Sequence, residues 1–129
     1  MKIYTQEITV SLSDLDELQH VNNVQYVQWV QDIAEAHWKS KATNDILNNY
    51  FWVLLNHSIQ YKSEAKLNEV IFLKTYVVNS EGLTSTRKVE MYHKNSEKLI
   101  VSSETVWCLM RYDTKKPTRI PAEIENLFS

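Results

Sequence analysis

The chain of 129 residues contains one glycine, two prolines and one cysteine. The single glycine, Gly82, excludes the glycine-rich loops that cradle phosphates and the fingerprint of dinucleotide-binding domains, because both need several glycines at fixed spacing. The single cysteine, Cys108, excludes an intramolecular disulfide and a cysteine-rich metal site. Cys108 lies in an apolar run, residues 106–110, so we expect a small buried hydrophobic side chain rather than a nucleophile.

Long apolar runs and an excess of one charge are also missing. No segment reaches the length needed to cross a bilayer, and residues 1–7 lack the apolar core of a signal peptide, so we expect a cytoplasmic protein. The formal net charge of −2 gives no reason to expect nucleic acid or a membrane as a partner. His37, His57 and His93 show no metal-ligand spacing with acidic or cysteine partners, so no metal site is expected.

What the sequence does contain is one long helical pattern rich in aromatic residues. The length fits a single domain, residues 1–129. Between residues 24 and 39, apolar side chains recur with helical spacing at Val27, Val30, Ala34 and Trp38, and others widen the stripe. A stripe this broad predicts a helix that is covered on several sides. Asn22 or Asn23 is its expected N-cap.

Extended patterns surround this helix. The predicted strands cover residues 3–12, 51–62, 70–78, 84–93 and 99–112, and a short helix is predicted over 122–128. In the second strand, one face is predicted to hold Phe51, Val53, Leu55, His57, Ile59 and Tyr61. Because glycine is scarce, positive φ in turns is expected at Asn48, Asn49, Asn68, Asn79 and Asn95. Four consecutive strands after one helix indicate an α+β fold with a five-stranded, mainly antiparallel sheet that continues into a partner subunit or packs on one.

The loop before the helix, residues 14–26, reads Asp-x-Asp-x-x-x-His-Val-Asn-Asn-x-x-Tyr. It places two carboxylates, an imidazole and two amides beside a helix N-terminus, where free backbone N–H groups attract developing negative charge. A carboxylate in such a loop can attack an electrophilic carbonyl or deprotonate a water. A loop built in this way can hydrolyse an acyl group.

Together with segments 59–65, 104–107 and 116–121, this loop resembles the hotdog-fold acyl thioesterases. The likeness is narrower to the 4-hydroxybenzoyl-CoA thioesterase branch, with a motif similar to that of plant-type acyl-ACP thioesterases. The resemblance implies one long central helix wrapped by the sheet, and a homodimer or homotetramer with active sites between subunits. It also implies hydrolysis of acyl-CoA or acyl-ACP, with CoA or the carrier's phosphopantetheine as part of the substrate and no separate cofactor.

The resemblance assigns roles to four residues. Asp16 matches the catalytic carboxylate, while His20 and Glu64 match assisting positions of the plant-type enzymes. The backbone N–H of Asn23, or of Val24, matches the donor that polarises the thioester carbonyl. The chain departs from the plant-type pattern at Leu18, which replaces an asparagine, and at Ala65, which replaces a cysteine. The second departure excludes a Cys-His mechanism at that position.

Each of these residues also has a plainer interpretation. Asp16 can serve only to cap the turn, as Asp14 is expected to do; His20 can simply hold the loop, and Glu64 can be a solvated charge. Two basic groups can meet CoA phosphates or an acidic carrier protein, or be ordinary surface charge: Lys115, Lys116 and Arg119, and Arg87 with Lys88. A non-catalytic acyl-binding module is the competing function, and a hydratase is disfavoured because the Gly/Pro-rich loop of that class is missing.

Overall fold

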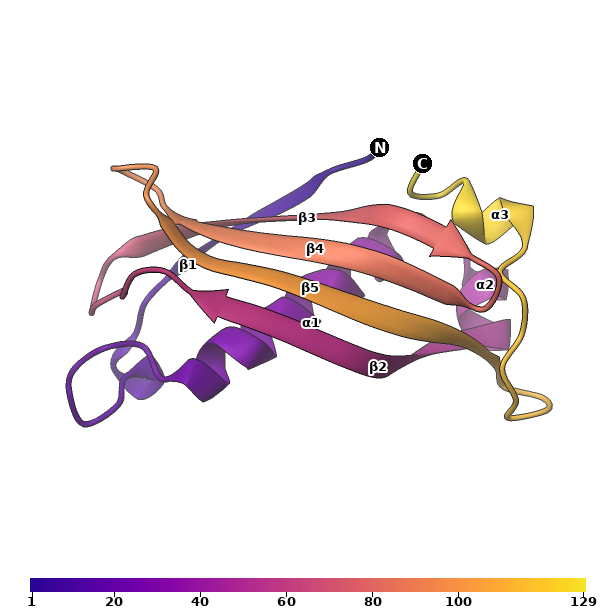
Figure 1. Ribbon diagram of the computed structural model, residues 1–129, viewed down its shortest axis with the longest axis horizontal. Coiled ribbons are helices and arrows are strands. Elements are labelled where there is room, and N and C mark those ends of the chain that lie inside the picture. Colours follow the sequence, from indigo (N-terminus) through magenta and orange to yellow (C-terminus); the bar gives the residue numbers. More distant parts are fainter.

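A long helix, α1 (Asn23–Lys41), lies across one face of a five-stranded sheet (Figure 1). The computed structural model describes residues 1–129. The strands are β1 (Tyr4–Thr9), β2 (Tyr50–Tyr61), β3 (Val70–Glu81), β4 (Thr84–His93) and β5 (Leu99–Arg111), and the shorter helices are η1 (Leu12–Asp14), α2 (Asn44–Asn49) and α3 (Ala122–Glu125). The sheet order is β1-β3-β4-β5-β2, and all neighbouring strands are antiparallel. The predicted α+β class, with its long helix and short C-terminal helix, is confirmed.

Asn22 is the N-cap of α1, which selects one of the two predicted caps, Asn22 and Asn23. Its backbone is extended, with φ −64° and ψ 137°, and its side chain accepts a hydrogen bond from the backbone N–H of Val24 at 2.9 Å. At the other end, Lys39 and Lys41 lie in the last turn, where cations interact favourably with the helix dipole. The helix therefore begins and ends where its local sequence provides partners for the free backbone groups.

The main core lies between α1 and the sheet. Val30 and Ile33 of the helix are fully buried, as are the facing side chains of β3 and β4, which are Ile71, Leu73, Val89 and Met91. A second apolar cluster forms where α1 ends and the short helices close that end of the sheet, from Trp38, Ile46, Leu109, Ile124 and Phe128 (Figure 1). None of the helices is both long and apolar enough to span a membrane.

Strand β2 does not keep one face along its length, so the predicted alternation is wrong in its first half. The register with β5 shifts between Leu54 and Asn56, which is a β-bulge at Leu55. Trp52, before the bulge, packs on the second cluster, and Ile59, after it, packs on the main core. Two residues separated by an odd number of positions can share a face only if a bulge lies between them.

Three further predictions about local structure are corrected. Residues 44–49, for which neither a helix nor a strand is predicted, form α2, and Thr43 caps it by accepting a hydrogen bond from Ile46 N–H at 3.2 Å. The first strand ends at Thr9 rather than at residue 12, since η1 follows it. Positive φ occurs at Gln19, Asn68, Glu97, Lys115 and Gly82, so only Asn68 of the five predicted asparagines takes it up.

Strand β2 forms one edge of the sheet, because it pairs with β5 on one side only. Its outer edge is twelve residues long. It exposes apolar side chains, with Val53 39%, Leu55 58% and Tyr61 42% accessible. A long apolar edge with unpaired backbone groups is the feature by which a sheet recruits another strand.

Candidate active site

Asp14 holds the loop together. Its carboxylate accepts hydrogen bonds from the backbone N–H of Ser11 at 2.8 Å and from the Ser11 hydroxyl at 3.0 Å. Its backbone carbonyl accepts a hydrogen bond from Asn22 N–H at 2.9 Å. These contacts close η1 and connect it to the cap of α1, so the side chain is committed to local structure, as expected.

Asp16 lies at the centre of a tight turn. Its Oδ1 accepts hydrogen bonds from the backbone N–H groups of Leu18 at 2.9 Å and His20 at 3.2 Å, and its own N–H donates to the His20 carbonyl at 2.8 Å. The turn passes through Gln19 at φ 65°. Oδ2 makes no hydrogen bond within the chain, so one oxygen fixes the orientation of the carboxylate and the other is available for chemistry.

His20 and Glu64 form a direct contact. His20 Nε2 lies 2.6 Å from Glu64 Oε2, with side chains 34% and 58% accessible. The backbone supports this contact, because His20 bridges to Lys66 and Val21 N–H donates to the Ala65 carbonyl at 3.0 Å. The loop after β2 is thereby joined to the loop before α1.

Tyr26, in the first turn of α1, also connects the helix to the loop after β2. Its hydroxyl accepts a hydrogen bond from the backbone N–H of Ala65 at 3.2 Å. Burial raises the pKa of Tyr26 to about 12, so the phenol stays neutral at physiological pH. Ala65 is fully buried, which explains why a small residue occupies this position.

The N-terminus of α1 offers one free backbone donor. Val24 N–H is taken by the Asn22 side chain at 2.9 Å, and Gln25 N–H by the Asn22 carbonyl at 2.9 Å. Asn23 N–H makes no hydrogen bond within the chain. Of the two donors named by the resemblance, only Asn23 is therefore available to a ligand oxygen.

The structure gathers all four predicted residues at one end of α1. Asp16 contacts His20 through the backbone, His20 contacts Glu64 through its side chain, and Asn23 begins the helix that follows. A carboxylate with one free oxygen, in the loop that leads into a helix with a free N–H, supplies groups that can activate a nucleophile and stabilise an oxyanion. The nearby His20–Glu64 pair adds a group that can hold or donate a proton.

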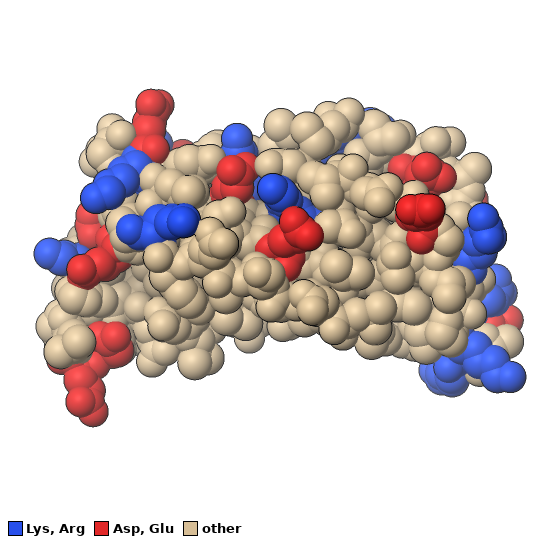
Figure 2. All heavy atoms as spheres, viewed as in Figure 1, with Lys and Arg blue, Asp and Glu red and all other residues tan.

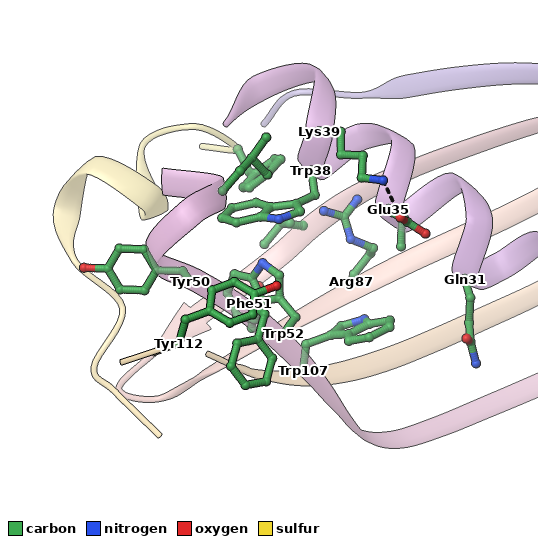
Figure 3. Close-up of a pocket in the computed structure, with 15 residues that line it drawn as sticks. Gln31, Glu35, Trp38, Lys39, Tyr50, Phe51, Trp52, Arg87, Trp107 and Tyr112 are labelled. Atoms are coloured by element: carbon green, nitrogen blue, oxygen red, sulfur yellow. Dashed lines mark ion pairs between the residues drawn. The ribbon is translucent and has the colours of Figure 1, made fainter. Parts of the chain in front are cut away.

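A cavity of about 430 Å³ lies at the opposite end of the helix (Figure 3). It is bounded by the second half of α1, the start of β2, and β4 and β5; its aromatic walls come from Trp38, Tyr50, Phe51, Trp52, Trp107, Tyr112 and Phe128. At 1.5 Å per residue, Trp38 lies roughly 22 Å along the helix from Asn23. None of the four predicted site residues lines this cavity.

Arg87 lines this cavity, although the sequence predicts it as a charge at the surface or against CoA phosphates. It was grouped with Lys88 as a charge for CoA phosphates or solvent, but its side chain is only 6% accessible and points from the sheet towards α1 (Figure 3). The signal that would have found it is the alternation of β4, since Ser85, Val89 and Met91 are also buried. Arg87 shares the inward face with them.

The other basic group does lie on the surface. Lys115, Lys116 and Arg119 are exposed, and the Lys115 ammonium lies 5.0 Å from the ring centre of Tyr112 at the rim of the cavity. Figure 2 shows basic side chains at this end of the molecule, while acidic and basic groups are mixed over the rest of the visible face. Of the two basic groups, only this one is fully exposed at the surface.

Comparisons with known proteins identify the family of the chain. Residues 10–128 match the thioesterase-like superfamily. A search of curated protein sequences finds no match. Among solved structures, a 1,4-dihydroxy-2-naphthoyl-CoA thioesterase from Synechocystis is 17% identical, with a TM-score of 0.84 over 98% of this chain and 95% of that one.

Two further structures show the same fold. A 4-hydroxybenzoyl-CoA thioesterase mutant complexed with 4-hydroxybenzoyl-CoA has a TM-score of 0.89 at 10% identity, covering 100% of both chains. The 12:0-ACP thioesterase from Umbellularia californica has a TM-score of 0.84 at 12% identity, covering 98% of this chain and 51% of that one. The predicted hotdog fold is confirmed, and the chain belongs to the thioesterase-like superfamily.

Proposed function

We propose that the protein hydrolyses an acyl-CoA thioester to a free acid and CoA. The observation that carries this proposal is that one short loop holds Asp16, with one carboxylate oxygen free, and leads into α1 at Asn23, whose backbone N–H is unpaired. Membership of the thioesterase-like superfamily supports the same reaction class. The loop and the start of α1 supply the two groups that thioester hydrolysis needs: hydrogen bonds orient the Asp16 carboxylate, and the helix backbone sets the direction of the Asn23 N–H.

The proposed reaction follows from these two groups. Asp16 Oδ2 acts on the thioester, either by deprotonating a water or by attacking the carbonyl carbon directly. Both routes place negative charge on the carbonyl oxygen, which the Asn23 N–H and the positive end of the helix stabilise. His20, held by Glu64, is the assisting group that positions the loop and the incoming water.

The active unit is proposed to be a homodimer formed through β2. The exposed outer edge of β2 fits an antiparallel strand from a second copy, which would extend the sheet across both subunits. The Tyr61 end of β2 lies near the start of α1, and the Tyr50 end lies at the cavity (Figure 1). Antiparallel pairing of the two β2 strands therefore brings the partner's catalytic loop to the cavity end of this subunit.

CoA is favoured over a carrier protein as the thiol. The 4-hydroxybenzoyl-CoA thioesterase structure holds an acyl-CoA, and the exposed Lys115, Lys116 and Arg119 lie at the cavity end, where phosphates of CoA would dock in such a dimer. An acyl carrier protein presents the same phosphopantetheine arm. The two substrates are separated by assaying matched acyl groups on CoA and on carrier protein.

The test is hydrolysis of an acyl-CoA panel by wild type, Asp16→Asn and the matched control Glu17→Gln. Glu17 is the exposed neighbour of Asp16 and makes no hydrogen bond or ion pair through its side chain. We expect Asp16→Asn to lose activity by at least about 100-fold, and Glu17→Gln to match wild type. Full activity in Asp16→Asn would overturn the site. Binding of acyl-CoA or acyl-ACP without hydrolysis of either would instead support the acyl-binding module.

A further inference from the structure

The aromatic cavity contains a buried cation with no carboxylate partner. The Arg87 side chain lines this cavity and is 6% accessible. Its Nη1 contacts His37 Nδ1 at 2.8 Å and donates to the Thr75 hydroxyl at 3.0 Å, and it makes no ion pair with an acidic residue. Buried guanidinium groups are normally paired with carboxylate or phosphate, since an uncompensated charge is costly to remove from water.

The remaining donors of Arg87 are free to meet a ligand. Its Nε and Nη2 make no hydrogen bond within the chain. The only fully buried side-chain nitrogen or oxygen left without a partner is His37 Nε2, so these two Arg87 nitrogens keep access to the cavity. A guanidinium edge with two N–H directions matches the two oxygens of a carboxylate.

The other groups facing this site do not supply the missing negative charge. Glu35 and Lys39 also line the cavity, but they pair with each other at 2.6 Å. His37 is neutral at physiological pH, because burial and the nearby Arg87 charge lower its pKa to about 4. Arg87 keeps its charge, since burial lowers its pKa only to about 10. The lining therefore carries one net positive charge within aromatic walls.

We propose that this cavity binds an apolar ligand through a carboxylate that pairs with Arg87. About 430 Å³ is enough for a small organic acid, and aromatic walls with one precisely placed polar group are typical of small-molecule sites. The rings of Trp38, Trp52 and Trp107 line the cavity (Figure 3), and the hydrocarbon part of the ligand would pack against them. The predicted loop of the same subunit, at the far end of α1, has no part in this site.

The carboxylate has two sources. It belongs either to a free organic acid or to the far end of an acyl group whose thioester lies at the partner's loop. The second source rests on the proposed function, because it requires the β2-paired dimer and hydrolysis. In that case the substrate class is the CoA thioester of a dicarboxylic acid, and Arg87 is the residue that determines specificity.

The first experiment needs no variant. Binding of octanoate and of 1-octanol to the wild-type protein is measured by tryptophan fluorescence and by calorimetry, because the two ligands share a chain length and differ in the carboxylate. We expect octanoate to bind at least tenfold more tightly. Equal affinity, or no binding of octanoate, would overturn the proposal.

Variants then assign the preference to Arg87. Arg87→Met should lose the tenfold preference for octanoate and keep its affinity for octanol, while Arg87→Lys should retain part of the preference. Lys88→Met, the neighbour on the other face of β4, is the matched control and should behave as wild type. An octanoate preference that survives intact in folded Arg87→Met would contradict the role of Arg87.

The second experiment identifies the source. The ratio of kcat/KM for suberyl-CoA to that for octanoyl-CoA should exceed ten in wild type and approach one in Arg87→Met if the carboxylate belongs to the acyl group. A ratio near one in wild type, with the octanoate preference intact, assigns the cavity to a free acid. If no acyl-CoA of the wider panel is hydrolysed either, the proposed function fails, whereas the binding result for the cavity still stands.

Discussion

His20 Nε2 lies 2.6 Å from Glu64 Oε2, although α1, α2 and β2 separate the two residues in the chain. The contact joins the loop that carries Asp16 to the loop that follows β2. Because both side chains are partly exposed, the pair contributes little to global stability. Its value is local, since it orients the imidazole beside the proposed site.

Removing this contact should impair catalysis without unfolding the protein. In Glu64→Ala, we expect kcat/KM to fall between about 10- and 100-fold, because a misplaced assisting group weakens the alignment of substrate and water. The midpoint of thermal unfolding should stay close to that of wild type. Steady-state kinetics and thermal unfolding measure both, with Glu17→Gln as the control. Unchanged kinetics in Glu64→Ala would show that this carboxylate is only a solvated charge.

His37 should make stability depend on pH. Burial, with the Arg87 and Lys41 charges adding to its effect, lowers the pKa of His37 from 6.5 to about 4. Between about pH 6.5 and pH 4, the unfolded chain therefore binds a proton at His37 that the folded protein does not bind. The contribution of neutral His37 to the free energy of unfolding is fully present above about pH 6.5 and is lost as the pH drops towards 4. His37→Gln, which keeps an acceptor for Arg87, should lose this part of the dependence. Urea unfolding of both proteins at pH 7.5, 5.5 and 4.5 measures the free energy of unfolding at each pH. The same change in this free energy with pH in both proteins would contradict the assignment.

The β2 edge should control assembly. Leu55 is 58% exposed at the bulge of β2, and we expect Leu55→Lys to convert a dimer to a monomer because it places a charge in the proposed strand pairing. Leu83→Lys is the matched control, since Leu83 is 45% exposed in the turn between β3 and β4, away from that edge. Sedimentation measures the mass of each protein. A wild-type monomer, or a dimer that survives Leu55→Lys, would contradict the proposed interface.

Local patterns in the sequence predicted most of this architecture. Helical spacing and the cap at Asn22 predicted α1, and the alternation over residues 84–93 matched β4 to its end residues. Such features depend on residues close together in the chain, so one sequence carries them. The crowding of polar groups before α1 likewise predicted a loop, and the structure shows this loop closed by backbone N–H groups that donate to the carboxylates of Asp14 and Asp16.

Two of the features that were missed depend on contacts between distant segments, and the third depends on a side-chain hydrogen bond within the N-cap of α1. The bulge at Leu55 allows Trp52 to pack on the second cluster and Ile59 to pack on the main core, and both clusters contain residues far from β2 in the sequence. The inward direction of Arg87 follows from the alternation of β4, but its place in a cavity depends on distant residues, since its side chain contacts His37 of α1 and Thr75 of β3. The choice of Asn23 over Val24 as the free donor required the hydrogen bond from Val24 N–H to the Asn22 side chain.

The most direct test of the central claim is a single backbone change at Asn23. Proline is well tolerated at the first helical position, and the extended backbone of Asn22 suits a following proline, so Asn23→Pro removes the N–H while keeping the fold. We expect its kcat for acyl-CoA hydrolysis to fall by about 10²- to 10³-fold. Asn23→Ala, which keeps the N–H, should retain the wild-type kcat. Equal, wild-type kcat values in both variants would contradict the assignment of this backbone donor to the oxyanion.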